Sequence, residues 1–159
     1  MRSVVLIPTY NEIDSLPSAL DRVRSAAVQA HILVIDDNSP DGTGALADAR
    51  AQSDDHIHVL HRTEKNGLGP AYLAGFKWAL ENDFELIIEM DADGSHRAED
   101  LALLIQRAEM ADKPDLVIGS RWISGGATQG WSQKRVLLSR AGNVYINLAL
   151  GLNVRDATA

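Results

Sequence analysis

The stretch Ile87-Ile88-Glu89-Met90-Asp91-Ala92-Asp93 decides the fold, because it is an apolar run that ends in two carboxylates one residue apart. On a buried strand, residues with this spacing point to the same face of the sheet. Just beyond the strand end, both carboxylates can reach one divalent cation, since hard cations prefer oxygen ligands. The stretch therefore predicts a strand whose carboxyl end holds a metal, and through that metal a diphosphate.

The string Asp91-Ala92-Asp93-Gly94-Ser95-His96 has other interpretations. Its composition is also that of a solvated turn. The string does not fit a calcium loop of the EF-hand type. Counted from Asp91, such a loop requires glycine at the sixth position and glutamate at the twelfth, where this chain has His96 and Ala102. Beside a hard-oxygen site, His96 is more often a loop or cap residue than a metal ligand.

Similar polar clusters follow two earlier apolar runs. Asp36-Asp37 follows His31-Ile32-Leu33-Val34-Ile35, and Pro8-Thr9-Tyr10-Asn11-Glu12 follows Val4-Val5-Leu6-Ile7. Open α/β sheets bind ligands beyond the carboxyl ends of their strands. We therefore expect the three clusters to lie together at one edge of a sheet.

Short apolar runs alternate with stretches of helical periodicity, which is typical of an α/β fold with a mainly parallel central sheet flanked by helices. Strands are expected near residues 3–8, 31–36, 56–60, 84–90 and 115–119. Helices are expected near residues 13–29, 43–53, 69–82, 97–111 and 132–150. The glycine-rich residues 119–130 are expected to form a mobile loop.

The chain has 159 residues, about the length of one domain. We expect a single domain over residues 1–159. The last residues contain neither a helix stop nor a polar tail, so the sequence looks cut at its carboxyl end inside a longer domain.

The first cluster has a structural interpretation beside a functional one. Thr9 and Glu12 have the spacing of a capping box, in which each side chain satisfies a backbone donor at a helix start. This interpretation gives no role to Tyr10. It is an aromatic side chain at a strand exit, where a nucleoside base could rest against it.

In the second cluster, one residue suffices to cap the following helix, and Asp41 and Thr43 are the candidates. Two adjacent carboxylates repel each other unless they find hydrogen-bond donors. Asp36 is expected to order the loop, and Asp37 to accept hydrogen bonds from ribose hydroxyls.

The segment Lys65-Asn66-Gly67-Leu68-Gly69 fits neither the Walker pattern nor the dinucleotide fingerprint, and we interpret it as a turn before a helix. The aromatic residues that follow, including Tyr72, are interpreted mostly as core.

The composition excludes several classes of protein. Fifteen basic against 22 acidic residues give a net charge of −7, which argues against non-specific electrostatic binding of nucleic acid. There is no cysteine, so disulfides and thiolate metal sites are impossible. No signal peptide is apparent, and no apolar stretch approaches the ~20 residues of a membrane span.

Basic residues gather in the last third of the chain. Arg121 follows the expected fifth strand, on the edge that carries the carboxylates, so a phosphate contact is favoured for it. Lys134 and Arg140 are typical of the solvated face of a helix. Arg135 and Ser139 are one turn apart and could present a guanidinium and a hydroxyl to a second phosphate.

Taken in order, these motifs resemble the polyprenol (dolichol) phosphate mannose synthases, which belong to the inverting, GT-A fold (Rossmann-like) glycosyltransferase family 2. The motifs span nearly the whole chain. They are Pro8-Thr9-Tyr10-Asn11-Glu12, Asp36-Asp37-Asn38-Ser39-Pro40-Asp41-Gly42-Thr43, Gly67-Leu68-Gly69, Met90-Asp91-Ala92-Asp93-Gly94-Ser95-His96, Gly119-Ser120-Arg121, Gly130-Trp131 and Ser139-Arg140.

The resemblance implies transfer of mannose from GDP-mannose to a polyprenyl (dolichyl) monophosphate, with Mg²⁺ or Mn²⁺ as cofactor. The product would be polyprenyl phosphate mannose for glycoconjugate synthesis and protein glycosylation. It also implies a peripheral location at the cytoplasmic face of a membrane and leaves room for a membrane-anchoring partner protein.

The resemblance also implies roles for individual residues. The donor would be held by Pro8, Tyr10, Glu12, Ile35, Asp37, Asp91, Ala92, Asp93 and Arg121. The metal would be held by Asp91 and Asp93, with Ser95 close enough to take part. Asp93 and Arg121 would be the catalytic residues, and Arg135 with Ser139 would face the acceptor phosphate.

An acceptor phosphate monoester has a second pKa near ~6, so it is largely a dianion at neutral pH and requires no general base. If the acceptor were instead a sugar hydroxyl, a carboxylate base would be needed, and Asp156 is the candidate.

Three alternatives stay open from the sequence. A polyprenyl phosphate glucose synthase using UDP-glucose would carry nearly the same metal and phosphate residues. A nucleotide-sugar binding module without catalysis is a second alternative. A phosphohydrolase of the haloacid dehalogenase type is weaker, because its Asp-x-Asp motif lies near the start of the fold, whereas here 90 residues precede Asp91.

Overall fold

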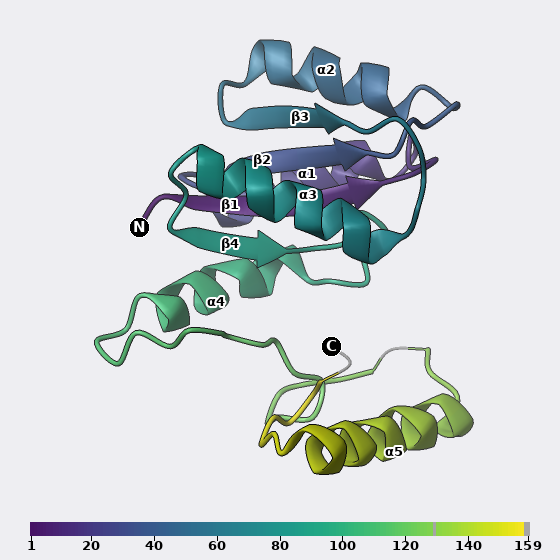
Figure 1. The fold of residues 1–159 in the computed structure, drawn as a ribbon, viewed down its shortest axis with the longest axis vertical. Helices are drawn as coiled ribbons and strands as arrows, with labels where there is room; N and C mark the ends of the chain where they lie inside the picture. Colours follow the sequence, from purple (N-terminus) through teal and green to yellow (C-terminus); the bar gives the residue numbers. More distant parts are fainter. Residues whose placement is uncertain (129, 158–159) are drawn as a thin grey trace. The chain divides into compact units, whose positions relative to one another are not determined.

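The computed structural model describes residues 1–128 and 130–157, which form two compact units, Met1–Glu109 and Met110–Ala159. The first unit contains a parallel sheet with the strand order β3-β2-β1-β4 (Figure 1). Its strands are β1 (Ser3–Thr9), β2 (His31–Asp36), β3 (Ile57–His61) and β4 (Leu86–Glu89). The predicted parallel α/β fold is confirmed.

Helices cover both faces of the sheet (Figure 1). These are α1 (Leu16–Ala26), α2 (Thr43–Ser53), α3 (Leu68–Glu81) and α4 (Leu101–Ala108), the last preceded by the 3₁₀ turn Ala98–Asp100. Val5 and Ile7 pack with α1, whereas Val4 and Leu6 pack with α3. Because β1 and β2 are buried on both faces, their sequences are nearly continuous apolar runs rather than alternating ones.

Gly75 allows α3 to approach the sheet closely. A Cβ atom at this position would lie 2.6 Å from Ile35 Cδ1 and 2.9 Å from Leu6 Cδ1. No side chain fits in that space without movement of the sheet residues, so the α3 packing requires glycine here.

The strand order shows at which point of the sheet a ligand is expected to bind. β1 lies centrally, with β2 and β3 on one side and β4 on the other, so the connections diverge between β1 and β4. In the register, Thr9 is paired with Asp36, and Leu6 with Glu89. The carboxyl ends of β1, β2 and β4 therefore meet at the topological switch point, where such sheets bind ligands.

Several expected boundaries differ from the structure. The helix expected at 97–111 begins as a 3₁₀ turn and ends at Ala108, and the helix expected at 13–29 covers only Leu16–Ala26. The strand expected at 84–90 begins at Leu86, because Phe84 closes the end of α3 by donating its amide to the Ala79 carbonyl.

The strand expected at 115–119 is wrong. These residues have no regular structure, and Leu116 is 73% exposed. An apolar run forms a strand only when a neighbouring strand pairs its backbone and a core accepts its side chains. Sequence alone shows neither.

The second unit is built on α5 (Gln133–Leu150). The Ser132 hydroxyl caps the helix by accepting the Arg135 amide at 3.3 Å. At the other end, Gly151 takes a left-handed conformation, and the Asn147 side chain bonds both the amide and the carbonyl of Val154. No helix in the described part of the chain is both long enough and apolar enough to cross a membrane.

Candidate active site

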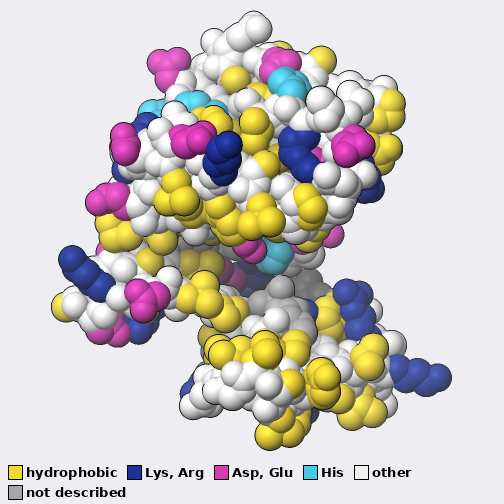
Figure 2. All heavy atoms as spheres, viewed as in Figure 1, with side chains coloured by type: hydrophobic (Ala, Val, Ile, Leu, Met, Phe, Trp, Pro, Cys, Tyr) yellow, Lys and Arg dark blue, Asp and Glu magenta, His cyan; other side chains and the backbone are white. Residues whose placement is uncertain are grey.

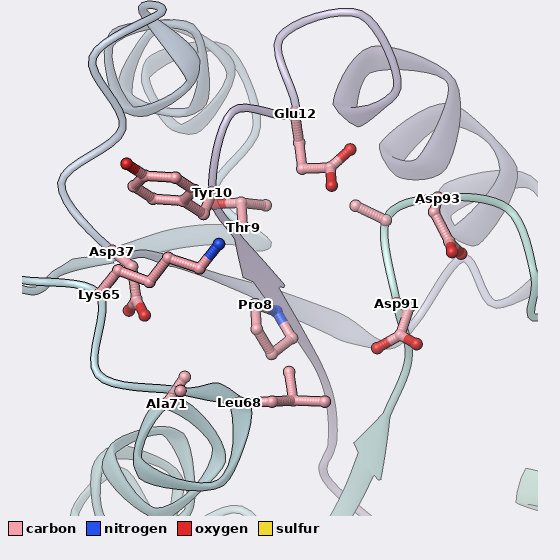
Figure 3. Close-up of a pocket in the computed structure, with 12 residues that line it drawn as sticks. Pro8, Thr9, Tyr10, Glu12, Asp37, Lys65, Leu68, Ala71, Asp91 and Asp93 are labelled. Atoms are coloured by element: carbon pink, nitrogen blue, oxygen red, sulfur yellow. The ribbon is translucent and has the colours of Figure 1, made fainter.

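A pocket of about 260 Å³ opens at the carboxyl edge of the sheet, between the ends of β1 and β4 and the start of α3 (Figure 3). Its lining contains seven of the predicted donor residues: Pro8, Tyr10, Glu12, Asp37, Asp91, Ala92 and Asp93. Of the remaining ones, Ile35 lies in the core with 0% exposed, and Arg121 belongs to the second unit. Ser95 does not line the pocket.

The end of β1 does not form the expected capping box. Thr9 is the last strand residue, and its hydroxyl lies 3.4 Å from the Ile35 carbonyl and from Asp36 Oδ1. The helix begins only at Leu16, and the Ser15 hydroxyl donates to the Glu12 carboxylate. The capping-box prediction is wrong, because that motif needs Glu12 in the first turn of the helix, and α1 begins only at Leu16. The Glu12 carboxylate instead lies at the pocket.

At the end of β2, the two aspartates have different roles. Asp36 accepts the Ser39 amide at 3.2 Å and the Ser39 hydroxyl at 2.6 Å, so the prediction that it orders the loop is confirmed. Asp41 accepts the amide and the hydroxyl of Thr43 at 2.9 and 2.6 Å, which secures the start of α2.

Asp37 lines the pocket and forms an ion pair with Arg62 at 2.6 Å, with only 7% of its side chain exposed. Arg62 comes from the end of β3 and also donates to the Asn66 side chain. Sequence reasoning missed Arg62, although it follows the third strand at the same edge. This cation offsets the charge of Asp37 and fixes its orientation.

The loop after β4 is held by its own polar groups. The Asp91 amide donates to His96 Nδ1 at 3.0 Å, which requires the imidazole proton to be on Nε2. The Asp93 carboxylate accepts the Ser95 amide at 2.8 Å, and this hydrogen bond holds the pKa of Asp93 below its usual value. His96 therefore has the loop role that the sequence favoured.

Tyr72 connects α3 to this loop. Its hydroxyl donates to Asp91 Oδ1 at 3.2 Å. Burial, with Asp91 next in effect, raises the pKa of Tyr72 above its ordinary value, so the phenol stays protonated and remains a donor. Burial and the charge of Asp91 also raise the pKa of Glu89. The sequence interpretation of Tyr72 as core missed this polar contact.

Asp91 and Asp93 supply oxygen ligands suited to Mg²⁺ or Mn²⁺. In the described residues, no three Asp, Glu, His or Cys side chains gather into a metal cluster. Two carboxylates leave most positions of such a cation to other oxygens, and Mg²⁺ is commonly held in this way by one or two carboxylates plus substrate phosphates. The residues present thus fit a cation that binds together with a diphosphate.

Lys65 is a pocket residue that sequence reasoning missed. It belongs to the loop between β3 and α3, and its amine lies 4.0 Å from the centre of the Tyr10 ring. Figure 3 shows the side chain extending into the pocket from the side of Asp37, opposite Asp91 and Asp93. The signal was its place after the third strand, at the same carboxyl edge as the acidic clusters.

In the second unit, Arg121 and Asp156 form a bidentate ion pair. Arg121 Nε lies 2.8 Å and Nη2 2.7 Å from the carboxylate oxygens of Asp156. Burial alone would raise the pKa of Asp156, but the hydrogen bonds from Arg121 lower it to about 2. Asp156 is therefore a poor general base at neutral pH, contrary to the role considered for it.

Trp131 brings two of the predicted phosphate residues together. The Arg135 guanidinium lies 3.9 Å and the Arg121 guanidinium 4.9 Å from the centre of its ring. Ser139 is half-buried, one turn from Arg135 on α5. The second unit thus gathers Arg121 and Arg135 around one aromatic ring.

Two of the curated proteins that match this chain are similar to it along nearly its whole length. An undecaprenyl-phosphate mannosyltransferase of Micrococcus luteus is 52% identical over 159 residues, covering 100% of this chain and 64% of the relative. A polyprenol monophosphomannose synthase of Mycolicibacterium smegmatis is 50% identical, covering 99% of this chain and 59% of the relative. The chain thus spans about three fifths of the length of these relatives.

Among solved structures, a mannosyltransferase of Pyrobaculum calidifontis in complex with GDP-Man and Mn²⁺ is similar. It superposes with a TM-score of 0.59 at 25% identity, covering 69% of this chain and 33% of the other. This similarity confirms the GT-A fold. The model of glycosyl transferase family 2 matches residues 4–159. On this match and the two curated relatives, the chain belongs to glycosyl transferase family 2.

Proposed function

We propose that this chain is the nucleotide-sugar binding part of an inverting mannosyltransferase that transfers mannose from GDP-mannose to a polyprenyl monophosphate. The observation that carries the proposal is the acidic pocket at the switch point, lined by Asp37 on one side and by Asp91 and Asp93 on the other. The names of the two curated relatives, at 50% and 52% identity, support the lipid phosphate acceptor and the mannosyl group.

The pocket suggests an orientation for the donor. Tyr10, Pro8 and Asp37 would hold the nucleoside, because an aromatic face and a fixed carboxylate suit a base and a ribose. The diphosphate would then lie toward Asp91, Ala92 and Asp93. Ile35 is fully buried and does not line the pocket, so we expect its contribution to be support rather than contact.

Asp91 and Asp93 would hold the Mg²⁺ or Mn²⁺ ion, with Ser95 within the same loop. When bound, such an ion stabilises the negative charge that develops on the leaving diphosphate. The chain itself contributes the carboxylate geometry, since the Ser95 amide fixes Asp93 and the Tyr72 hydroxyl fixes Asp91.

For the acceptor, a phosphate dianion needs no general base, which agrees with a pKa of about 2 for Asp156. Arg121, Arg135 and Ser139 are proposed to contact that phosphate, because guanidinium groups recognise phosphate through paired hydrogen bonds. The role of Asp156 would then be to orient Arg121.

A polyprenyl acceptor requires contact with a membrane surface, and α5 has the chemistry for it. Leu137, Leu138 and Leu148 are each at least 70% exposed. The helix also carries Lys134, Arg135 and Arg140 and no acidic residue. Figure 2 shows hydrophobic side chains on the visible surface of this unit with Lys and Arg nearby. We propose a peripheral location at the cytoplasmic face of a membrane, together with a membrane-anchoring partner protein.

The test is calorimetric titration of the chain with GDP and UDP, with and without Mn²⁺. We expect GDP to bind only with the metal, and an Asp93→Asn variant to lose that binding. Asp55→Asn serves as the matched control, because Asp55 is exposed and lies outside the pocket. A preference for UDP would move the proposal to the glucose-transferring relative, and failure to bind either nucleotide would overturn it.

The transfer step needs its own assay, with GDP-mannose and vesicle-dispersed polyprenyl phosphate. Formation of lipid-linked mannose supports the enzyme, whereas metal-dependent GDP binding without any turnover supports a binding module.

A further inference from the structure

The pocket carries an excess of negative charge that a nucleotide diphosphate must overcome. Its lining contains four carboxylates, Glu12, Asp37, Asp91 and Asp93, and one cationic side chain, Lys65. A nucleoside diphosphate is itself an anion, and like charges at short range oppose binding. A divalent ion at Asp91 and Asp93 offsets only part of this repulsion, so a protein cation in the pocket gains importance.

Lys65 can supply that cation, because the backbone of its loop is anchored while its amine forms no ion pair in the described residues. Asn38 donates to the Thr63 carbonyl at 3.2 Å, and Arg62 donates to Asn66, so the residues on both sides of Lys65 are anchored. Within residues 1–128 and 130–157, the Lys65 amine forms no ion pair, and its contact is the Tyr10 ring at 4.0 Å.

The neighbouring cation cannot take this role. The Arg62 guanidinium is engaged by Asp37 at 2.6 Å and by Asn66, and Arg62 does not line the pocket. Lys65, by contrast, ends in a compact charge on a flexible stem, which can leave an aromatic ring for a phosphate oxygen. A cation over an aromatic ring is held less strongly than one in a charge-assisted hydrogen bond to phosphate.

We propose that Lys65 is a donor-binding residue whose ammonium moves from the Tyr10 ring to the diphosphate of the nucleotide, freeing the ring face for the base. The inference rests on the proposed function, because it assumes that the pocket binds a nucleoside diphosphate. It assigns a role to a loop that fits neither the Walker pattern nor the dinucleotide fingerprint.

The test compares GDP with guanosine, each with Mn²⁺, on the wild-type chain and on Lys65→Met, Lys65→Arg and the control Lys77→Met. Lys77 lies on α3 with 77% of its side chain exposed and does not line the pocket. Loss of one charge-assisted hydrogen bond predicts roughly 10- to 100-fold weaker GDP binding for Lys65→Met. Guanosine binding should change less than about 3-fold, Lys65→Arg should recover most of the GDP affinity, and Lys77→Met should match wild type.

The outcomes separate the two proposals. If wild type binds GDP with metal and Lys65→Met binds it equally well, the role of Lys65 is overturned and the proposed function stands. Equal losses for GDP and guanosine would place the contact on the nucleoside and also overturn it. A wild-type chain that binds no nucleotide overturns the proposed function together with this inference.

Discussion

At the scale of single residues, the pocket depends on polar contacts that fix its carboxylates before any ligand arrives. Arg62 holds Asp37, Tyr72 holds Asp91, and the Ser95 amide holds Asp93. Preorganised groups cost little reorganisation when a ligand binds. These supporting residues should therefore matter for affinity although none of the three lines the pocket.

Replacing Arg62 by Met should destabilise the protein by about 2–4 kcal/mol, because it leaves the Asp37 carboxylate buried without its cation. The side chains of this pair are only 14% and 7% exposed, so solvent replaces little of the lost interaction. Urea unfolding measures the change. The control is Arg97→Met, whose pair with Asp100 is 68% and 53% exposed and should cost less than about 1 kcal/mol. Equal effects of the two variants would contradict this account of Asp37.

At the scale of elements, the position of α3 determines the pocket floor, since Leu68 and Ala71 at its start line the cavity. Gly75 sets how close the helix lies to the sheet. A change in this packing should move the start of α3 and the Tyr72 hydroxyl along with it.

Gly75→Ala should cost roughly 1–3 kcal/mol, because its Cβ would lie 2.6 Å from Ile35 Cδ1 in a packed core. Gly69→Ala in the same helix is the matched control. It has nothing within 4 Å of a new Cβ, so it should be neutral or stabilise by up to about 1 kcal/mol. Thermal or urea unfolding distinguishes them, and a neutral Gly75→Ala would show that the sheet accommodates the methyl group.

The amino edge of the sheet, opposite the pocket, should make stability depend on pH. His31 at the start of β2 lies against His58 and His56, and burial with these neighbours lowers the pKa of His31 to about 4. Between pH 6.5 and about 4, the unfolded chain then binds more protons than the folded one. The contribution of His31 to the free energy of unfolding is therefore fully present above pH 6.5 and decreases as the pH falls through this window.

Urea unfolding at several pH values measures this slope, which solvent screening keeps below the roughly 1.4 kcal/mol per pH unit of one full proton. His31→Gln should flatten the curve between pH 6.5 and about 4. An unchanged curve would mean that other groups account for the pH dependence.

At the scale of the whole molecule, charge is distributed unevenly. The chain carries a net charge of −7, whereas α5 carries three basic residues and no acidic one. An acidic protein is repelled by anionic lipid unless a local basic and apolar surface compensates.

Leu138→Glu or Leu148→Glu should therefore weaken cosedimentation with anionic vesicles several-fold, because each removes an exposed apolar side chain from α5 and adds a negative charge. Leu103→Glu on α4, where the side chain is 63% exposed, is the control and should have little effect. If all three variants bind vesicles as wild type does, α5 is not the membrane-contact surface.

The sequence predicted the four strands of the sheet because the central ones, β1 and β2, are buried, nearly continuous apolar runs that end in polar clusters. It also predicted that Tyr10, Asp37, Asp91 and Asp93 would meet, since parallel strands share one carboxyl edge. It failed for residues 115–119, where an apolar run has no strand to pair with. It missed Arg62 and Lys65, although both follow the third strand at this edge, because their partners Asp37 and Tyr10 lie far away in the chain.

The most direct measurement of the central claim is a crystal structure of the chain with GDP and Mn²⁺, including an anomalous difference map at the manganese edge. The account predicts a manganese peak at the carboxylates of Asp91 and Asp93, the base beside Tyr10, and Lys65 on the diphosphate. A metal peak away from these carboxylates, or a nucleotide bound outside this pocket, would contradict it.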